Sequence, residues 1–171
     1  MNNLPKKNVV IDTNVALVAN RKAIHADEDC IDTCIQVIED IRDRCCVVVD
    51  NQWAIMREYE GQLNSSDQPG VGDAFLKWLL THLWNPSYCL QVEITPHAVR
   101  GFQEFPDDPA LGGFDRSDRK FVAVARAAGL DSPPPILNAS DTDWWDHRAA
   151  LNAHGIQIKF LCPQLMPHEE R

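Results

Sequence analysis

Two runs of apolar residues, each ending in an aspartate, constrain the fold more than any other feature of this sequence. Asn-Val-Val-Ile-Asp covers residues 8–12, and Cys-Cys-Val-Val-Val-Asp covers residues 45–50. Continuous apolar strands are buried on both faces, which is typical of parallel sheets covered by helices on both sides. These runs therefore predict strands at the centre of an α/β fold.

Segments with a helical spacing of apolar residues alternate with the strands. The periodicity predicts further strands over residues 88–95, 135–140 and 156–161, and helices over residues 14–20, 27–44, 51–63, 73–84, 119–129 and 141–155. The strand at 88–95 is expected at an edge of the sheet. The alternation predicts an α/β three-layer sandwich with a central, mainly parallel sheet flanked by helices.

Length and charge limit the domain organisation and the partners. The 171 residues contain no repeat and no linker, so residues 1–171 are expected to form a single domain. The net charge of −9 and the pI near 5.0 argue against binding nucleic acid through a broad basic surface. They do not exclude a polyanionic substrate, because divalent metal ions invert the local field.

The apolar content and the cysteines suggest a cellular compartment. No apolar run approaches the roughly 20 residues that span a bilayer, and the amino terminus lacks the pattern of a signal peptide. We therefore expect a cytoplasmic protein without membrane contact. The six cysteines contain no CxxC pair, and Cys30 and Cys34 share one helix face. We expect reduced, mostly buried thiols and neither a disulfide framework nor a zinc site.

Acidic residues gather where strands end and helices begin. In parallel sheets, ligands bind at the carboxyl ends of the strands, so acids from separate segments are expected to meet there. The acids in question are Asp12, Asp50, Glu58, Glu60, Asp115, Asp118, Asp141 and Asp143.

A group of carboxylates points to a hard cation. Neighbouring carboxylates repel one another, and Mg²⁺ or Mn²⁺ prefers such oxygen ligands and activates water for attack on a phosphodiester. Each acid also has a structural interpretation. Asp12 and Asp50 would cap the following helices, Asp115 and Asp118 would favour a helix dipole, and the Ser-Asp-Thr-Asp run at 140–143 would form a turn. Periodicity alone does not choose between Glu58 and Glu60.

Four segments together resemble the PIN-domain ribonuclease family. They are VVIDTNVAL at 9–17, IMREYEGQL at 55–63, DRSDRKFVAVA at 115–125 and ILNASDTDWW at 136–145. The resemblance implies a PIN-like, Rossmann-type sandwich. It also implies a nuclease that depends on Mg²⁺ or Mn²⁺ and cleaves single-stranded RNA, in many bacterial members as a toxin paired with an antitoxin protein. A homodimer is a further expectation from the family.

The resemblance also assigns residues. It implies that Asp12, Glu58, Asp118 and Asp141 are catalytic and bind the metal, with Asp143 as a further ligand. Thr13 and Asn14 would support Asp12, and the Glu-Tyr context favours Glu58 over Glu60. The segment at about 64–114 is long for a toxin-type PIN domain and is expected to add elements of its own.

A second class of function stays open from the residues. The chain would then be a non-cleaving, PIN-like module that binds RNA or a partner protein. Trp144 and Trp145 would stack on bases or belong to the core, and Arg116, Arg119 and Lys120 would meet phosphates or form a solvated helix face. Dinucleotide, P-loop and GxSxG motifs are absent from the sequence.

Overall fold

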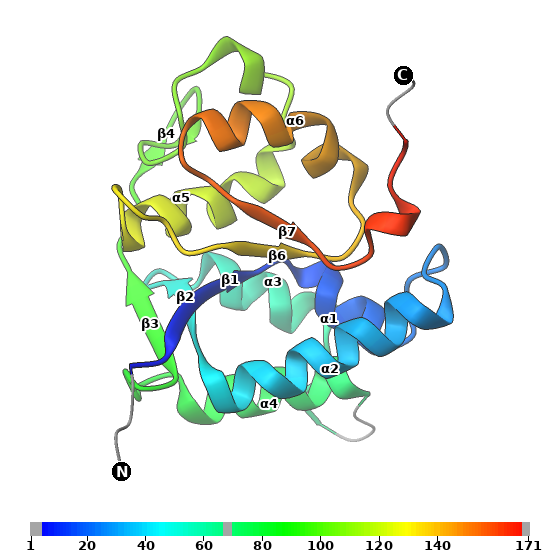
Figure 1. The fold of residues 1–171 in the computed structure, drawn as a ribbon. Helices are drawn as coiled ribbons and strands as arrows, with labels where there is room; N and C mark the ends of the chain where they lie inside the picture. The colour runs from blue at the N-terminus through cyan, green and yellow to red at the C-terminus, as the bar shows by residue number, and fades with distance from the viewer. Residues whose placement is uncertain (1–4, 67–69, 169–171) are drawn as a thin grey trace.

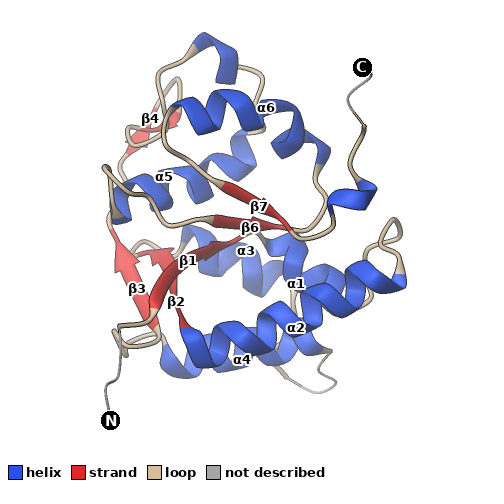
Figure 2. Cartoon of the chain, viewed as in Figure 1, coloured by secondary structure: helices blue, strands red, loops and turns tan. Residues whose placement is uncertain are grey.

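Five parallel strands form the central sheet, in the order β3-β2-β1-β6-β7 (Figures 1 and 2). The structure is a computed structural model and describes residues 5–66 and 70–168. The first four residues of the amino terminus and residues 67–69 of the loop expected after the third helix lie outside the described residues. The elements are β1 (Lys7–Ile11), α1 (Thr13–Ala19), α2 (Glu28–Arg44), β2 (Cys45–Asp50), α3 (Ala54–Gln62), α4 (Val71–His82), β3 (Cys89–Val92), β4 (Pro96–His97), β5 (Gly101–Phe102), α5 (Arg119–Ala128), β6 (Ile136–Asn138), α6 (Thr142–Ala153) and β7 (Ile158–Phe160), with short 3₁₀ turns at Pro109–Leu111, Arg116–Asp118 and Pro163–Leu165.

The central strand β1 is buried because both of its neighbours and both helical layers cover it. It pairs in parallel with β2 through Val9 and Val47, and with β6 through Val10 and Ile136. These side chains are at most 4% exposed. The continuous apolar runs therefore form the buried centre of the sheet, as their composition predicts.

Helices cover both faces of the sheet. In Figure 1, α5 and α6 lie on one side of it, and α2 and α4 lie on the other. Helix α1 packs against α2 and α4, while α3 contacts α1, α5 and β2 and so bridges the two layers. The predicted three-layer α/β sandwich is confirmed.

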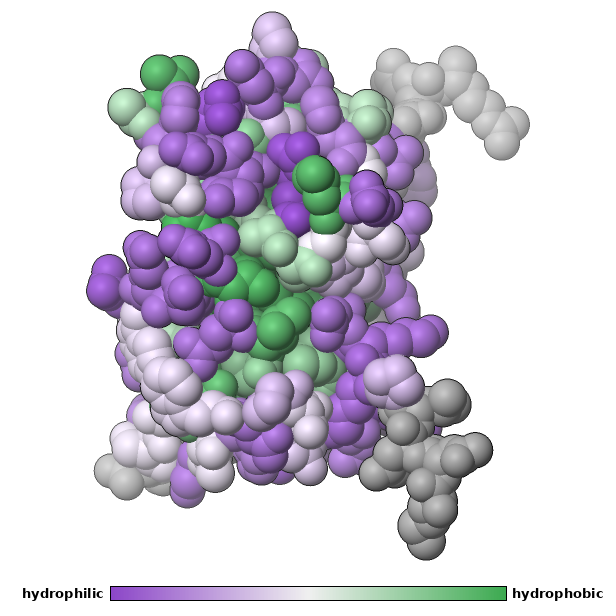
Figure 3. Space-filling view, turned by 90° about the vertical axis from the view of Figure 1, so that its left-hand side faces the viewer, coloured by the Kyte–Doolittle hydropathy of each residue, from purple (hydrophilic) through white to green (hydrophobic). Residues whose placement is uncertain are grey.

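The segment 64–114 contributes both to the sheet and to a separate hairpin. It contains α4, the strand β3 and the antiparallel pair β4–β5. Strand β3 pairs in parallel with β2 and ends the sheet, so the expected edge position is confirmed. Figure 3 shows the side on which β3 lies, where apolar side chains cross the middle of the surface between hydrophilic borders.

A disulfide joins Cys30 in the first turn of α2 to Cys162 in the loop after β7, with Cα atoms 5.3 Å apart. The expectation that all six thiols are reduced is therefore wrong for these two residues. They are 132 residues apart, and only the folding of α2 against the end of β7 makes them neighbours. The other four cysteines are free.

No helix among the described residues combines the length and the apolar character that a membrane crossing needs.

Candidate functional site

The candidate site lies at the carboxyl end of β1, where the strands that follow β1 in the chain lie on opposite sides of it. Strands β2 and β3 lie on one side of β1, and β6 and β7 lie on the other. The carboxyl ends of β1 and β6 therefore lie at a topological switch point, the usual ligand position in such sheets. A backbone hydrogen bond of 2.9 Å from the Asp12 N–H to the Leu137 carbonyl joins the two strand ends.

Asp12 caps a helix and also lies close to three other acids. One carboxylate oxygen accepts a 2.9 Å hydrogen bond from the Asn14 backbone N–H and caps α1. The other oxygen faces the Asn138 amide at 3.3 Å. Burial raises the pKa of the Asp12 carboxyl well above its usual value, and the charges of Asp118, Asp141 and Glu58 raise it further. A cap alone does not require this shared repulsion with three other acids.

Glu58, and not Glu60, joins the acidic group. The Glu58 carboxylate accepts hydrogen bonds from the Thr13 hydroxyl and, at 3.1 Å, from the Lys120 ammonium group. Glu60 instead accepts a 3.1 Å hydrogen bond from the Trp53 indole at the start of α3. The resemblance therefore selects the glutamate that the fold places beside Asp12.

Asp118 and Asp141 complete the group. Burial is the largest cause that raises the pKa of Asp118 to about 7, followed by the charges of Asp141, Asp115 and Glu58, while Lys120 opposes the shift. Burial also raises the pKa of Asp141, which caps α6 by accepting a 2.8 Å hydrogen bond from the Asp143 N–H. The two acids are electrostatically coupled although they lie in separate segments of the chain.

Asp143 and Asp115 lie at the border of the group. The Asp143 carboxylate accepts a 2.9 Å hydrogen bond from the Asp115 N–H and lies 3.3 Å from the His147 ring. The Asp115 carboxylate accepts hydrogen bonds from the Ser117 backbone and hydroxyl, which hold its pKa below the usual value. Asp115 therefore has the role of a helix cap.

Asp50 stabilises the turn before α3. Its 1% exposed carboxylate accepts hydrogen bonds of 3.1, 2.9 and 2.9 Å from the N–H groups of Gln52, Ala54 and Ile55. Its oxygens are therefore committed to the N-terminus of a helix, and the interpretation of Asp50 as a cap is confirmed.

The predicted substrate contact Arg119 is wrong. Its side chain is 5% exposed, and its guanidinium donates hydrogen bonds to the carbonyls of Arg100, Leu111, Gly112 and Phe114 at 3.0 to 3.3 Å. The guanidinium also lies 4.6 Å from the centre of the Phe105 ring. Arg119 holds the loop before α5 in place, because a buried guanidinium requires acceptors all around it.

The other two basic residues bind within the protein as well. Arg116 is exposed and donates to the Val99 and Ala98 carbonyls at 2.6 and 3.4 Å. Lys120 donates to the Ser117 carbonyl in addition to Glu58, and its side chain is only 13% exposed. Its ammonium group is a positive charge inside the acidic group.

The sequence interpretation missed Asn138. Its fully buried side chain donates to Asp12, and its side-chain carbonyl oxygen accepts a 2.9 Å hydrogen bond from the Asp141 N–H. Asn14 acts in parallel, since its side-chain oxygen accepts from the Ala139 N–H at 3.1 Å. An amide that ends the otherwise apolar strand at 136–138 was the signal for this link.

The two tryptophans beside the group differ. Trp144 is fully buried and packs edge-on against Phe114 at 4.9 Å, so it belongs to the core. Trp145 is half-buried, and the Arg148 guanidinium lies 3.9 Å from the centre of its ring.

The carboxylates are close enough to interact but not closely packed. Within residues 5–66 and 70–168, no three of these carboxylates have oxygen atoms that all lie within 4.8 Å of one another. The three residues that meet this criterion are Cys30, Cys34 and Cys162. The acids are thus more widely spread than simultaneous ligation of one ion by three of them requires. Mg²⁺ is commonly held by one or two carboxylates together with waters and substrate phosphates, and this looser spacing suits that mode.

Searches of protein-family models, of curated proteins and of solved structures return no match to this chain. The resemblance to PIN domains therefore depends on the four motifs alone.

Proposed function

We propose that this chain is a PIN-like, divalent-metal-dependent nuclease that cleaves the phosphodiesters of single-stranded RNA. The observation that carries the proposal is the convergence of Asp12, Glu58, Asp118 and Asp141, from four separate segments, at the switch point of the sheet. Burial raises the pKa values of Asp12, Asp118 and Asp141, and the charges of neighbouring carboxylates raise them further. A bound cation would relieve this repulsion.

The donor set fits Mg²⁺ or Mn²⁺. All four side chains offer oxygen, which these hard ions prefer, and no sulfur or imidazole ligand lies among the four. One or two of Asp12, Glu58, Asp118 and Asp141 would ligate the ion directly and the others would reach it through water, with Asp143 at the border through its link to Asp115. A bound ion of this kind activates water and stabilises the charge that develops on a phosphodiester.

Uncharged neighbours orient the acids. Thr13 fixes one oxygen of Glu58, while Asn14 and Asn138 tie the Asp12 turn to the loop at Ala139 and Asp141. Lys120 partly neutralises Glu58, which lets the group persist without a metal ion. These contacts place the acids before any ion or substrate arrives.

The family resemblance supplies the finer parts of the proposal. It favours single-stranded RNA as substrate, a homodimer and, for a toxin-type member, an antitoxin protein as partner. We also propose that the protein acts in the cytoplasm, as the sequence analysis expects. The segment 64–114 is the part of the chain in which this protein would differ from compact toxin-type members.

One observation favours the second candidate, a non-cleaving PIN-like module that binds RNA or protein. The Glu58 carboxylate already accepts hydrogen bonds from Lys120 and Thr13. The Lys120 ammonium group therefore neutralises part of the negative charge of the acids without a metal ion. A module of this kind would keep the acids as a structural network and would not need a metal ion.

Cleavage assays with a matched pair of variants separate the two functions. Labelled single-stranded RNA is incubated with the wild type, Glu58→Gln and Glu60→Gln, each with Mn²⁺ or with EDTA. The nuclease proposal expects EDTA and Glu58→Gln to reduce cleavage by orders of magnitude, while Glu60→Gln stays close to the wild type. RNA that remains intact with Mn²⁺ and wild-type protein would support the binding module instead.

A further inference from the structure

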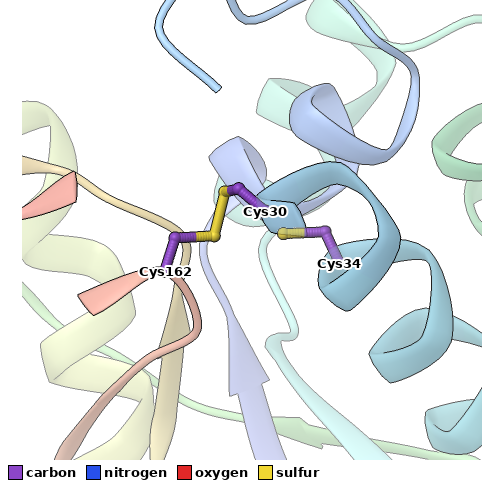
Figure 4. Close-up of side chains that lie close together, drawn as sticks. All are labelled: Cys30, Cys34 and Cys162. Atoms are coloured by element: carbon purple, nitrogen blue, oxygen red, sulfur yellow. A yellow bond between two sulfur atoms is a disulfide. The ribbon is translucent and has the colours of Figure 1, made fainter. Parts of the chain in front are cut away.

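Three cysteine side chains meet in the core, and none of them is close in the sequence to any of the four acids. Cys30 and Cys34 point from the first two turns of α2 toward Cys162 in the loop after β7 (Figure 4). All three are fully buried. Their sulfur atoms all lie within 4.8 Å of one another, although the disulfide uses only Cys30 and Cys162.

The third sulfur has a simple alternative role. A buried free cysteine behaves as a small apolar side chain, and Cys89 in β3 is an example, 3% exposed and free. Cys34 differs because its sulfur lies within 4.8 Å of two other sulfurs, that of Cys30 in the same helix and that of Cys162 in the loop after β7. Packing alone does not require three sulfurs to converge in this way.

Thiol–disulfide exchange does not suit this arrangement. Exchange requires a thiolate that attacks the disulfide. Burial raises the pKa of the Cys34 thiol to about 12, so very little thiolate is present at neutral pH.

The sulfur spacing becomes compatible with a thiolate-bound metal ion once the Cys30–Cys162 bond opens, because bonded sulfurs lie closer together than two ligands of one ion. Three sulfurs in a plane around an ion, each with a bond of about 2.3 Å, lie about 4.0 Å from one another. This separation falls within the 4.8 Å that already encloses the group, so small side-chain movements suffice once the disulfide is open. Soft thiolates select Zn²⁺ or Cu⁺ over Mg²⁺ and Mn²⁺.

Acidic residues surround the start of α2. Asp27 caps the helix by accepting a 2.8 Å hydrogen bond from the Cys30 N–H, and Glu28 and Asp29 lie in the first turn. Glu28 is paired with Arg21 at 2.9 Å. The remaining carboxylates give this end of α2 a negative potential, which favours the approach of a cation.

We propose that the reduced form of this protein binds one thiophilic ion, such as Zn²⁺, through Cys30, Cys34 and Cys162. A dithiol reductant supplies two electrons and two protons to open the disulfide and is itself oxidised to a disulfide. A phosphine supplies the two electrons and takes up the oxygen of a water molecule, whose two protons go to the cysteine sulfurs. The three thiols then release three protons as three sulfur–metal bonds form. The disulfide and the metal ion are alternative links between α2 and the loop after β7, and the redox state determines which one forms.

Cadmium titration of the full-length chain tests this proposal. The metal-free protein is prepared in two forms, reduced with a phosphine or left oxidised, and thiol counting should find six and four free thiols respectively. Cd²⁺ is added with excess Mg²⁺ present to occupy oxygen ligands, and the ultraviolet thiolate-to-cadmium band is followed. The reduced form should bind one Cd²⁺ per chain, a large excess of Zn²⁺ should compete with it, and the oxidised form should show no band.

Two variants provide the matched comparison. Cys34→Ala should weaken Cd²⁺ binding by about tenfold or more, equivalent to about 1.4 kcal/mol. Cys89→Ala should bind like the wild type, because Cys89 is an equally buried free thiol whose pKa is also raised to about 12. Equal binding by Cys34→Ala and the wild type, a band in the oxidised form, or no band in the reduced wild type would overturn the proposal.

A second measurement requires no variant and stays decisive if Cys34→Ala fails to fold. The reduced wild type is alkylated with and without Zn²⁺, and the modified cysteines are identified by mass spectrometry. Zn²⁺ should slow the modification of Cys30, Cys34 and Cys162 and leave the rates of the other three cysteines unchanged. Uniform slowing, or no slowing at Cys34, would contradict the proposed site.

Discussion

Replacing Asp118 by asparagine should stabilise the metal-free protein at neutral and alkaline pH. The Asp118 carboxyl is buried next to Asp141, Asp115 and Glu58, and its pKa rises from 3.8 to about 7. Asparagine keeps nearly the same shape but carries no charge, so the repulsion disappears. A residue that only served a helix dipole would instead lose about 0.3 to 1 kcal/mol on this change.

The sign and the pH range follow from the raised pKa. Between pH 3.8 and about 7 the folded state binds more protons at Asp118 than the unfolded state, so this carboxyl lowers the free energy of unfolding as the pH rises. The penalty is absent below pH 3.8 and complete above about pH 7. One pKa unit corresponds to about 1.4 kcal/mol, so the full shift sets an upper limit of about 4 kcal/mol. Because the asparagine of the variant would still bury a polar amide, we expect a gain of about 1 to 3 kcal/mol.

Thermal unfolding in EDTA at about pH 4 and about pH 8 measures this effect. Asp118→Asn should melt near the wild type at the lower pH and above it at the higher pH, by about 2 to 4 °C for each kcal/mol in a domain of this size. Asp115→Asn is the matched control, because hydrogen bonds from Ser117 lower the pKa of Asp115. That variant should lose stability at the higher pH. A destabilised Asp118→Asn protein under the same alkaline conditions would refute the proposed repulsion among the acids.

Three further variants test other parts of the structure. Without reductant, Cys162→Ser should lower the free energy of unfolding by about 2 to 4 kcal/mol in a urea titration, because the disulfide joins residues 132 positions apart, whereas Cys89→Ser should have a smaller effect. Arg119→Met should destabilise the protein by about 2 to 4 kcal/mol in the same titration, because four carbonyls, two of them in buried and two in part-buried contacts, lose a charged donor, while the exposed Arg116→Ala should lose less than about 1 kcal/mol. Asn138→Ala should cost about 1 to 3 kcal/mol and should also weaken RNA cleavage, because the Asp141 N–H and the Asp12 carboxylate lose their shared partner. Unchanged stability in any of these variants would show that the contact has no structural role.

Local patterns in the sequence were sufficient to predict most of the fold. The apolar runs that end at Asp12 and Asp50 are buried strands. Helix α1 begins directly after its cap Asp12, whereas α3 begins at Ala54, after a turn whose N–H groups Asp50 binds. The edge position of β3 followed from its mixture of apolar and polar residues. Such features depend on residues that are close together in the chain, so they can be predicted from a single sequence.

The site and the cross-links depend on contacts between distant residues. The pairing of Lys120 with Glu58 spans 62 residues, the Asn138 contact to Asp12 spans 126, and the disulfide spans 132. No local pattern determines such partners. Arg119 was misjudged for the same reason, because its position next to Asp118 suggested a substrate contact, while the loop that buries it comes from residues 100–114.

The most direct test of the proposed function measures Mn²⁺ binding and RNA cleavage on the same protein preparation. Mn²⁺ is titrated into the wild type and into Asp12→Asn, and binding and cleavage of single-stranded RNA are followed together. If Asp12, Glu58, Asp118 and Asp141 form the metal site, both signals of the wild type should reach half their maximum at the same Mn²⁺ concentration, and Asp12→Asn should lose both while remaining folded. Unchanged Mn²⁺ affinity in Asp12→Asn, or RNA cleavage that persists in this variant, would contradict the assignment of the site.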